Sequence, residues 1–325
     1  MKRISTIGLA VAGSFFATPA VADEFSFDIG ASYGRTQYEG SSTTVFEGHS
    51  FYSDGTLFVT GESDTDTLTL FGTWYFAGLS DDNGPRARAA FVDRASAVSA
   101  LYSHQEESSS YSIVSSVPEI SSGQREFDES ADFYAVAGRL VGRESGWFAE
   151  AAVTESDLSF GSKRSAWSLG VGKYLFDTTA LSVSAGNVDE RFGYETDIYA
   201  LGFTHLGQMG QSWQYALDLA YEHERPNTDF VDDADNWSTR LALYPTRNLE
   251  FGIAYADSER RIGDPTGSSI EGFASWFITP KIELGARYRV DEFDRAFTTA
   301  SGSGIVESTS NDDQDSFGVT FNMRF

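Results

Sequence analysis

The last nine residues of the chain, FGVTFNMRF, alternate strictly between apolar side chains and polar or small ones. Neighbouring side chains of a β-strand point to opposite faces, so this strand presents one apolar face and one hydrophilic face. Such a strand fits a membrane β-barrel, in which one face contacts lipid and the other contacts water. The last strand of a soluble β-protein would also alternate, so the interpretation needs support from the rest of the chain. The apolar set is Phe317, Val319, Phe321, Met323 and Phe325.

Residues 1–22 have the features of a secretory signal peptide. Lys2 and Arg3 precede an apolar stretch, and Ala20-Val21-Ala22 forms a small-x-small cleavage site. We therefore expect residues 23–325 to form the exported protein. No segment approaches the ~20 consecutive apolar residues of a transmembrane helix. A closed barrel is the remaining way to span a membrane, because its backbone hydrogen bonds are all satisfied within the sheet.

The composition agrees with a barrel. Aromatic residues make up 14% of the chain and there are 31 glycines, yet the mean hydropathy is only -0.28. This combination is expected when only every second strand residue meets lipid. The absence of cysteine excludes a disulfide framework and a cysteine metal site. The net charge of -25 argues against a nucleic-acid partner, whose phosphates would be repelled.

Alternating segments recur along the whole chain. In Ile282–Val290, for example, apolar side chains alternate with two arginines, a glutamate and a glycine. A soluble sandwich could alternate as well, but it would rarely continue the pattern over so long a chain as one unit. We therefore predict one all-β domain, a transmembrane antiparallel β-barrel. The clearest strands are residues 25–33, 68–76, 147–153, 167–175, 213–221, 237–243, 249–255, 282–290 and 317–325.

Short turns alternate with longer polar connections between these strands. Bacterial outer-membrane barrels have short periplasmic turns and longer external loops, and both termini are periplasmic. The chain has this asymmetry. The short turns are at 53–55, 142–146, 176–179, 206–211, 245–248 and 279–281, and the longer connections are at 106–131, 225–236, 259–268 and 294–314.

Two parts of the chain resemble known families. The last strand, with Phe321 and Phe325 on its apolar face, resembles the signal by which the barrel-assembly machinery of Gram-negative bacteria recognises outer-membrane barrels. The residues Gly72-Thr73-Trp74-Tyr75-Phe76, Gly84-Pro85, Ala90-Phe91 and Arg94-Ala95-Ser96 resemble the recurrent pattern of a less characterised porin family. The resemblance implies an outer-membrane location, contact with outer-membrane lipid and, as in the general bacterial porins, a homotrimer. It implies no cofactor.

The strand count depends on a weak hairpin at Thr43–Thr60. With this hairpin the barrel has roughly sixteen strands, and without it about fourteen. We expect sixteen, because residues 106–131 then become the third external loop, which folds into the pore in general trimeric porins. The short loop-three motif of those porins is not present.

The connection 106–131 is our candidate for the constriction. It carries carboxylates at Glu119, Glu126, Asp128 and Glu129, and an apolar stretch precedes most of them. A loop folded against the inner wall would bury this stretch and present the carboxylates to arginines across the pore. Alternatively, the apolar residues pack the loop on itself or on a neighbouring subunit. The arginines expected across the pore are Arg139, Arg240, Arg287 and Arg289.

Alternation also predicts which charges face the lumen. A basic side chain on the lipid face would cost roughly 2 to 4 kcal/mol near mid-bilayer, so confinement of charge to one face is meaningful. The inward charges form either a tuned constriction or a hydrated wall of salt bridges. They are Arg139, Arg240, Arg287, Arg289, Arg324, Asp28, Glu150, Asp218, Glu222, Glu250 and Glu283.

A barrel enzyme acting on lipid or peptide is the alternative from another class. The chain has four histidines, and His104 and His223 stand beside glutamates near strand ends. Catalysis needs convergent geometry that no spacing here demonstrates, so we interpret them as solvated rim residues. The acidic groups at 232–235 and 312–315 lack the glycine and the final glutamate of an EF-hand loop. We interpret them as solvated loop residues; the alternative is that they bind lipopolysaccharide phosphates through divalent cations.

We therefore expect a porin that admits small hydrophilic solutes and ions by passive diffusion, with no enzymatic activity. The excess of acidic residues predicts a mild preference for cations. A substrate-specific channel is the alternative within the same class.

Overall fold

The computed structural model describes residues 25–47, 54–79, 84–158, 162–189, 195–210, 212–228, 233–260, 266–301 and 304–325. The expected signal peptide lies outside these residues. The strands are β1 (Phe25–Glu47), β2 (Gly55–Leu79), β3 (Ala97–Ser115), β4 (Gly123–Val141), β5 (Trp147–Leu158), β6 (Ser162–Phe176), β7 (Thr179–Asp189), β8 (Glu195–Met209), β9 (Trp213–Pro226), β10 (Ala234–Thr246), β11 (Leu249–Arg260), β12 (Thr266–Thr279), β13 (Ile282–Ser301) and β14 (Gly304–Arg324). Two short helical turns, η1 (Arg86–Arg88) and α2 (Ala89–Val92), lie between β2 and β3. Within the described ranges, no helix is long and apolar enough to cross a membrane.

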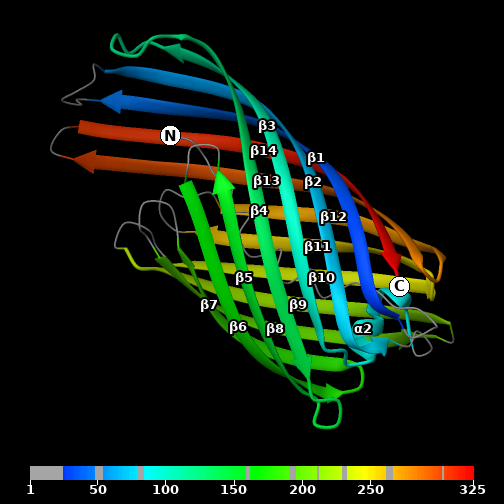
Figure 1. Cartoon of the computed structure of the whole chain (residues 1–325). Coiled ribbons are helices and arrows are strands. Elements are labelled where there is room, and N and C mark those ends of the chain that lie inside the picture. Colours follow the sequence, from blue (N-terminus) through cyan, green and yellow to red (C-terminus); the bar gives the residue numbers. More distant parts are fainter. Residues whose placement is uncertain are drawn as a thin grey trace.

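The fourteen strands form one closed antiparallel barrel (Figure 1). Each strand pairs with its chain neighbours, and β1 pairs with β14 to close the sheet. The predicted all-β antiparallel barrel is confirmed, and the alternative count of fourteen is the observed one.

The count of sixteen strands is wrong because the expected hairpin at Thr43–Thr60 is the far end of β1 and β2. Their register continues from the pair Phe27 and Trp74 to the pair Phe46 and Gly55. The outer parts of both strands carry polar side chains on both faces, in Ser41–Thr44 of β1 and in Glu62–Thr67 of β2. Because neither face is apolar there, the sequence shows no alternation that would indicate that these strands continue.

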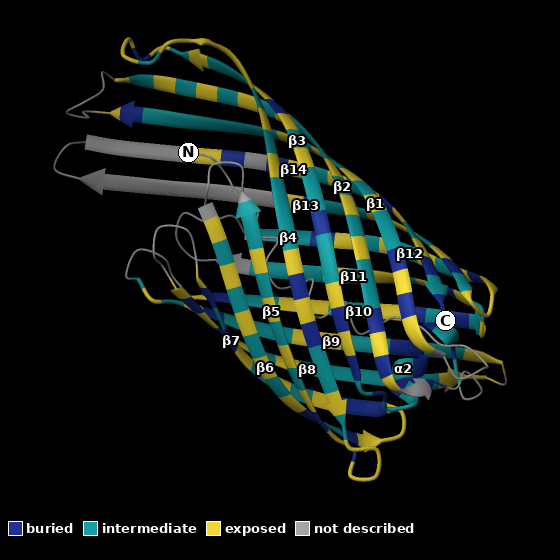
Figure 2. Ribbon diagram, viewed as in Figure 1, coloured by how far each residue is buried: buried dark blue, intermediate teal, exposed yellow. Residues whose placement is uncertain are grey.

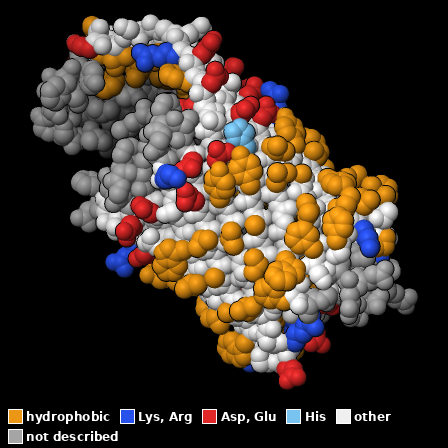
Figure 3. Space-filling view, viewed as in Figure 1, with side chains coloured by type: hydrophobic (Ala, Val, Ile, Leu, Met, Phe, Trp, Pro, Cys, Tyr) orange, Lys and Arg blue, Asp and Glu red, His pale blue; other side chains and the backbone are white. Residues whose placement is uncertain are grey.

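The outer face of the barrel is apolar and the inner face is polar, the reverse of a soluble protein. All six tryptophans lie on the outer face, and their side chains are between 40% and 58% exposed. Figure 2 shows exposed and less exposed residues alternating along the strands. Figure 3 shows hydrophobic side chains gathered over the middle of this face, with acidic side chains mostly beyond them. An apolar band of this kind is the surface that lipid covers in a transmembrane barrel.

Tyrosines mark one edge of the apolar band. Tyr33 donates a hydrogen bond to Asp66 at 2.5 Å, and Tyr102 donates one to Asp132 at 2.8 Å. On the other side of the barrel, Tyr221 donates to Asp235 at 2.6 Å. A tyrosine with an apolar ring and a hydrogen-bonded hydroxyl suits the boundary between lipid and water. We call this set the tyrosine ring.

The two ends of the barrel differ. At the end that holds Phe325, which we call the turn end, strands are joined by short turns such as 142–146 and 247–248. The amide of Phe325 donates to the carbonyl of Phe27 at 2.8 Å, which ties the last residue to β1. At the opposite end, which we call the loop end, the hairpins β1–β2 and β3–β4 extend well beyond the tyrosine ring.

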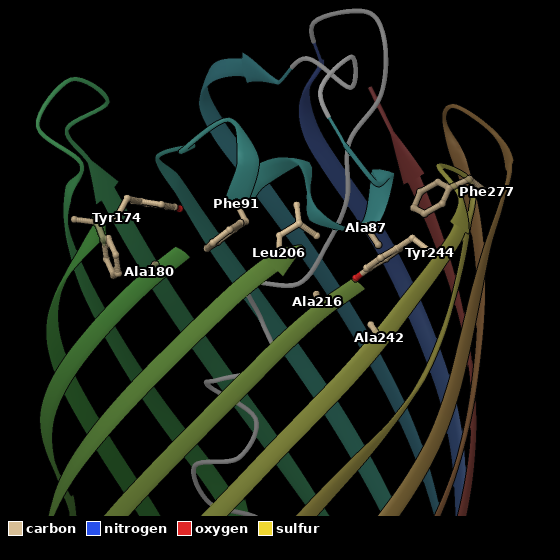
Figure 4. Close-up of a cluster of buried hydrophobic side chains, with 10 residues drawn as sticks. Ala87, Phe91, Tyr174, Ala180, Leu206, Ala216, Ala242, Tyr244 and Phe277 are labelled. Carbon is tan, nitrogen blue, oxygen red and sulfur yellow. The ribbon is translucent and has the colours of Figure 1, made fainter. Parts of the chain in front are cut away.

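One connection at the turn end folds into the barrel. Residues 84–96, which we call the inner segment, include η1 and α2 and lie between β2 and β3 (Figure 4). Ala87 and Phe91 form one apolar cluster with inward-facing side chains of β5 to β10 and of β12. The inner segment thus builds a small apolar core inside an otherwise polar lumen. Its partners are Phe148, Tyr174, Ala180, Leu206, Ala216, Ala242, Tyr244 and Phe277.

Candidate pore

The strand register places the charged half of the alternating pattern on the inner face. Arg139 pairs with Glu150 across β4 and β5, and Arg240 pairs with Asp218 across β10 and β9. These residues project from the face opposite to the exposed tryptophans. The lumen is therefore lined by charged and hydroxyl side chains, as a water-filled channel requires.

Arg88 fastens the inner segment to the far wall of the barrel. Its guanidinium donates through Nη1 to Asp218 at 3.2 Å and forms a salt bridge to the other oxygen of that carboxylate. Its Nε donates to the Tyr244 hydroxyl at 3.0 Å. Burial opposes the charge of this guanidinium, yet Tyr244 and Asp218 together raise the pKa of Arg88 above its usual value. The anchor therefore stays cationic at any physiological pH.

Backbone contacts hold the same segment at the rim. The Arg86 amide donates to the Arg247 carbonyl at 3.0 Å, and the Arg247 Nε donates to the Gly84 carbonyl at 3.4 Å. Arg247 lies in the turn between β10 and β11. The inner segment therefore crosses the turn end from the β2–β3 wall to the opposite rim and occupies part of the lumen there.

The contacts of Arg88 extend into a hydrogen-bonded network of side chains on the inner face of β10 and β11. Tyr244 donates to Glu250 at 3.0 Å, and Arg240 donates to the same carboxylate oxygen at 2.7 Å. Arg240 also lies 3.7 Å from Asp218 and stacks on Phe273, with 4.1 Å between the guanidinium carbon and the ring centre. Such networks rigidify a site when their members are satisfied.

Arg139 forms a second ion pair near the inner segment. It lies 3.3 Å from Glu150 and donates to the Tyr174 hydroxyl at 3.1 Å. Its guanidinium carbon is 4.1 Å from the centre of the Phe148 ring. The Tyr174 ring lies 5.2 Å from the ring of Phe91 in the inner segment and 5.5 Å from that of Phe148, so this ion pair lies beside the same apolar cluster.

A third charged group lies at the closure of the barrel. Arg324 and Asp28 are each 1% exposed, and their side chains approach to 3.6 Å across β14 and β1. Arg324 also lies 3.3 Å from Glu283 on β13, and Asp28 accepts a hydrogen bond from Tyr75 at 3.2 Å. This group joins the first and the last strands through their inner faces.

Arg289 and Arg287 lie on β13 closer to the middle of the barrel. Arg289 is held by Asp291, with its Nε donating at 2.8 Å. Arg287 is exposed to the lumen. The four arginines that we expected across the pore therefore differ in their neighbours. Arg139, Arg240 and Arg289 each lie close to a carboxylate, whereas Arg287 is exposed to the lumen.

The sequence interpretation missed the inner segment. Gly84-Pro85 reads as an ordinary turn, but the stretch from Arg86 to Val92 has no alternation and separates two clear strands at the turn end. It is longer than any other turn at that end. A long, non-alternating connection among short turns is the signal that could have identified it.

The expectation of a long loop at residues 106–131 is wrong. These residues belong mostly to β3 and β4, whose register runs from the pair Ala97 and Arg139 to the pair Ile113 and Gly123. Only a short turn at 116–122 joins them. The apolar stretch serves this turn, because Val117 is 1% exposed and packs beside Gly55. The alternative that the stretch packs locally describes it better.

The carboxylates expected at the constriction are therefore spread out. Glu119 lies in the turn, while Glu126 and Asp128 fall on the outer face of β4 with Asp132. Glu129 falls on the inner face, directly across from Glu107 on β3. The long strands separate these groups from Arg139 at the other end of β4.

Acidic residues predominate in the loop-end half of the lumen. Glu107 accepts a hydrogen bond from Ser63 at 2.9 Å, and Asp312 accepts one from Tyr38 at 2.6 Å. On β9, Glu224 accepts from Asn236 at 2.8 Å. We call this region the acidic vestibule, formed by Glu107, Glu129, Glu222, Glu224 and Asp312.

The described histidines do not face the lumen. His104 and His223 lie on the outer face just beyond the tyrosine ring, and each contacts an aspartate at 2.9 Å, Asp132 and Asp235 respectively. His49 and Asp232 lie outside the described residues. Among the residues that the structure describes, no group of three or more His, Cys, Asp or Glu side chains is arranged to hold a metal ion.

The terminal phenylalanines lie on the lipid-facing surface. Phe321 and Phe325 are 42% and 58% exposed, and Phe321 pairs with Ala31 and Leu284 across its neighbours. Both side chains therefore contribute to the apolar outer surface of β14 and not to a core inside the barrel. Their part in assembly stays a prediction.

Comparisons by sequence identify no relative. No family model matches the chain, and no curated protein matches it significantly.

Comparison of structures finds outer-membrane proteins. The outer-membrane protein Omp33 of Acinetobacter baumannii is similar with a TM-score of 0.53 and 17% identity, covering 93% of this chain and 99% of that protein. A bacterial polysaccharide outer-membrane secretin follows with a TM-score of 0.43 and 10% identity over 89% and 98% of the two chains. OpdL of Pseudomonas aeruginosa has a TM-score of 0.36 and 12% identity over 91% and 99%. The chain has the fold of an outer-membrane β-barrel.

Proposed function

We propose that this protein is an outer-membrane porin, a water-filled channel for the passive diffusion of small hydrophilic solutes and ions. The observation that carries the proposal is the inversion of the two faces. A closed barrel with an apolar outer band and a charged inner wall needs lipid outside and water inside. The likeness to Omp33 supports the fold on which this argument rests.

The barrel would stand with its turn end toward the periplasm and its loop end outside the cell. Short periplasmic turns and longer external hairpins are the rule for such barrels. Outer-membrane lipid and lipopolysaccharide would surround the apolar band. The barrel-assembly machinery and a homotrimeric state follow only from the resemblance of the sequence to porins.

We further propose a mild preference for cations. The acidic vestibule lies where solutes would enter, while the ion pairs of Arg139, Arg240 and Arg324 lie nearer the turn end. Each of these arginines is neutralised by a carboxylate beside it, so together they cancel little of the negative potential that the vestibule carboxylates create. Carboxylates in a channel with low-dielectric walls raise the local concentration of cations.

The test is conductance of the purified barrel in planar lipid bilayers. We expect discrete current steps and, under a gradient of KCl, a reversal potential of the sign that indicates preference for K⁺. A folded, inserted barrel that never conducts would contradict the proposal and favour the alternative of a barrel enzyme. Lipid and peptide hydrolysis assays on the same preparation would then be the next measurement.

A substrate-specific channel is distinguished by swelling of proteoliposomes. A porin should admit sugars, amino acids and small acids at rates that fall smoothly with size. Saturable uptake of one class, with exclusion of others of equal size, would favour the specific channel.

A further inference from the structure

Arg287 differs from the other arginines of the barrel wall. Arg139, Arg240, Arg289 and Arg324 each lie within 4 Å of a carboxylate, at 3.3, 2.7, 2.5 and 3.3 Å respectively. Arg287 has no such contact with any described residue, and its side chain is exposed. It faces the lumen from β13, between Phe273 of β12 and Gly318 of β14.

The neighbouring strand leaves room for this side chain. Gly318 lies directly across from Arg287, and Gly34 lies beyond it on β1. A Cβ at Gly318 would stand 2.9 Å from the Arg287 Nε and 3.3 Å from its Cγ. The aliphatic part of the Arg287 side chain therefore lies over Gly318, where the inner face of β14 carries no side chain.

The nearest inward-facing acids along β13 are engaged elsewhere. Asp291 binds Arg289, and Glu283 binds Arg324 and accepts from Asn322 at 3.4 Å. The inward neighbours on β14, Ser316 and Thr320, carry no charge. On β12, the inward-facing Glu271 lies directly across from Arg289, and Phe273 lies across from Arg287. The guanidinium of Arg287 thus presents its donors to the water of the lumen.

We propose that Arg287 is the residue of this channel that contacts anionic groups, carboxylates or phosphates, of passing solutes. This inference rests on the proposed porin function and adds a specificity-determining residue to it. An arginine keeps its charge at any physiological pH, and its planar fork matches a carboxylate or phosphate with two parallel hydrogen bonds. The paired arginines have their forks occupied. Arg287 therefore limits the cation preference that the acidic vestibule creates.

The test compares Arg287→Gln with Arg143→Gln in planar bilayers under a KCl gradient. Arg143 lies in the exposed turn between β4 and β5, so its replacement removes the same charge outside the lumen. We expect Arg287→Gln to raise the permeability ratio of K⁺ to Cl⁻ by about twofold or more, because a charge inside a focusing channel outweighs one at its rim. Arg143→Gln should leave the ratio unchanged.

Two anions then probe the contact itself. Succinate or inorganic phosphate, added to the wild-type channel in KCl, should lower the mean current, and Arg287→Gln should abolish that effect. Arg287→Lys should keep the permeability ratio but weaken the effect of the anions, because an ammonium lacks the fork. An effect of succinate alone identifies carboxylates as the group that is bound, and an effect of phosphate alone identifies phosphates.

The inference is overturned if Arg287→Gln conducts with an unchanged permeability ratio and an unchanged response to both anions. If that variant does not insert, Arg287→Lys decides the matter, since an unchanged response to the anions in Arg287→Lys overturns the inference as well. A wild-type barrel that never conducts contradicts the porin function instead. The two failures are therefore distinguishable.

Discussion

Single residues in this barrel divide into those that make it stable and those that face moving solutes. Arg324 belongs to the first kind, because it is 1% exposed, pairs with Asp28 and Glu283, and stacks on Phe277 at 4.3 Å. Arg287, which is exposed, belongs to the second. The sequence placed both on the same face by alternation, but it could not tell them apart, because burial depends on the inner segment and on cross-strand neighbours.

Replacing Arg324 by methionine should destabilise the barrel. The change leaves the carboxylates of Asp28 and Glu283 buried without their cation, and breaking a buried pair in this way typically costs about 3 to 5 kcal/mol. Urea unfolding in lipid vesicles measures the free energy of unfolding. Lys281→Gln, in the exposed turn between β12 and β13, is the control and should change it little. Equal stability of Arg324→Met and the wild type would show that the closure does not depend on this group.

Deletion of Phe325 should reduce insertion into the outer membrane while export continues. The side chain is 58% exposed, so its loss removes little packing inside the protein, while deletion of the residue also removes its backbone hydrogen bonds to Ser26 and Phe27. The amount of heat-modifiable barrel in outer-membrane fractions measures insertion, and cleavage of the signal peptide measures export. Substitution of Phe176, a 72% exposed residue at the turn end, is the control for lost apolar surface. A normal yield of barrel from the truncated chain contradicts the role of this residue in assembly.

Whole elements show where sequence patterns succeed and where they stop. The membrane-facing parts of the strands were predictable, because lipid on one side and water on the other enforce alternation. The outer part of β1 and β2 was not, because Ser41–Thr44 and Glu62–Thr67 meet water on both faces and need no apolar set. The inner segment was not predicted for a related reason, because a short helical connection is too short to show a recognisable hydrophobic periodicity.

The inner segment should control conductance at the turn end. Arg88→Ala removes the hydrogen bonds to Asp218 and Tyr244 that fasten the segment to the far wall. Release of the segment widens that end, so we expect larger or more variable single-channel currents than in the wild type. Arg143→Gln serves as the control in the same bilayer experiment. Identical currents in a folded Arg88→Ala barrel would show that the current is limited elsewhere.

Shortening the turn at 116–122 should leave the conductance unchanged. The turn joins β3 and β4 at the loop end, beyond the tyrosine ring. The hydrogen bond from the Ser115 amide to Ser122 holds it to its own hairpin, and the bond from the Ser116 amide to the Thr56 carbonyl holds it to the neighbouring strand β2. A loop folded into the pore would give the opposite result, a rise in conductance when it is shortened. Single-channel recording of the deletion variant separates the two arrangements.

At the scale of the whole molecule, the distribution of charge along the lumen sets the behaviour of the channel. Carboxylates of the acidic vestibule face the loop end, ion pairs gather toward the turn end, and the net charge of the chain is -25. Selectivity that comes from this field must weaken as salt screens it, whereas exclusion by size does not depend on salt. The screening length falls from about 30 Å at 0.01 M to about 3 Å at 1 M.

We therefore expect the preference for K⁺ over Cl⁻ to be clear in dilute KCl and to fade toward equality near 1 M, as screening shortens the reach of each charge to about 3 Å. Reversal potentials measured at a fixed concentration ratio, with the mean concentration raised stepwise, test this. Replacing Glu107 by glutamine removes one vestibule carboxylate and should lower the preference in dilute salt only, while Glu144→Gln, in the exposed turn at the other end, should not. A preference that stays constant across salt concentrations would place the selectivity in direct contacts at a narrow point of the pore, and a preference for anions in dilute salt would show that Arg287 outweighs the vestibule.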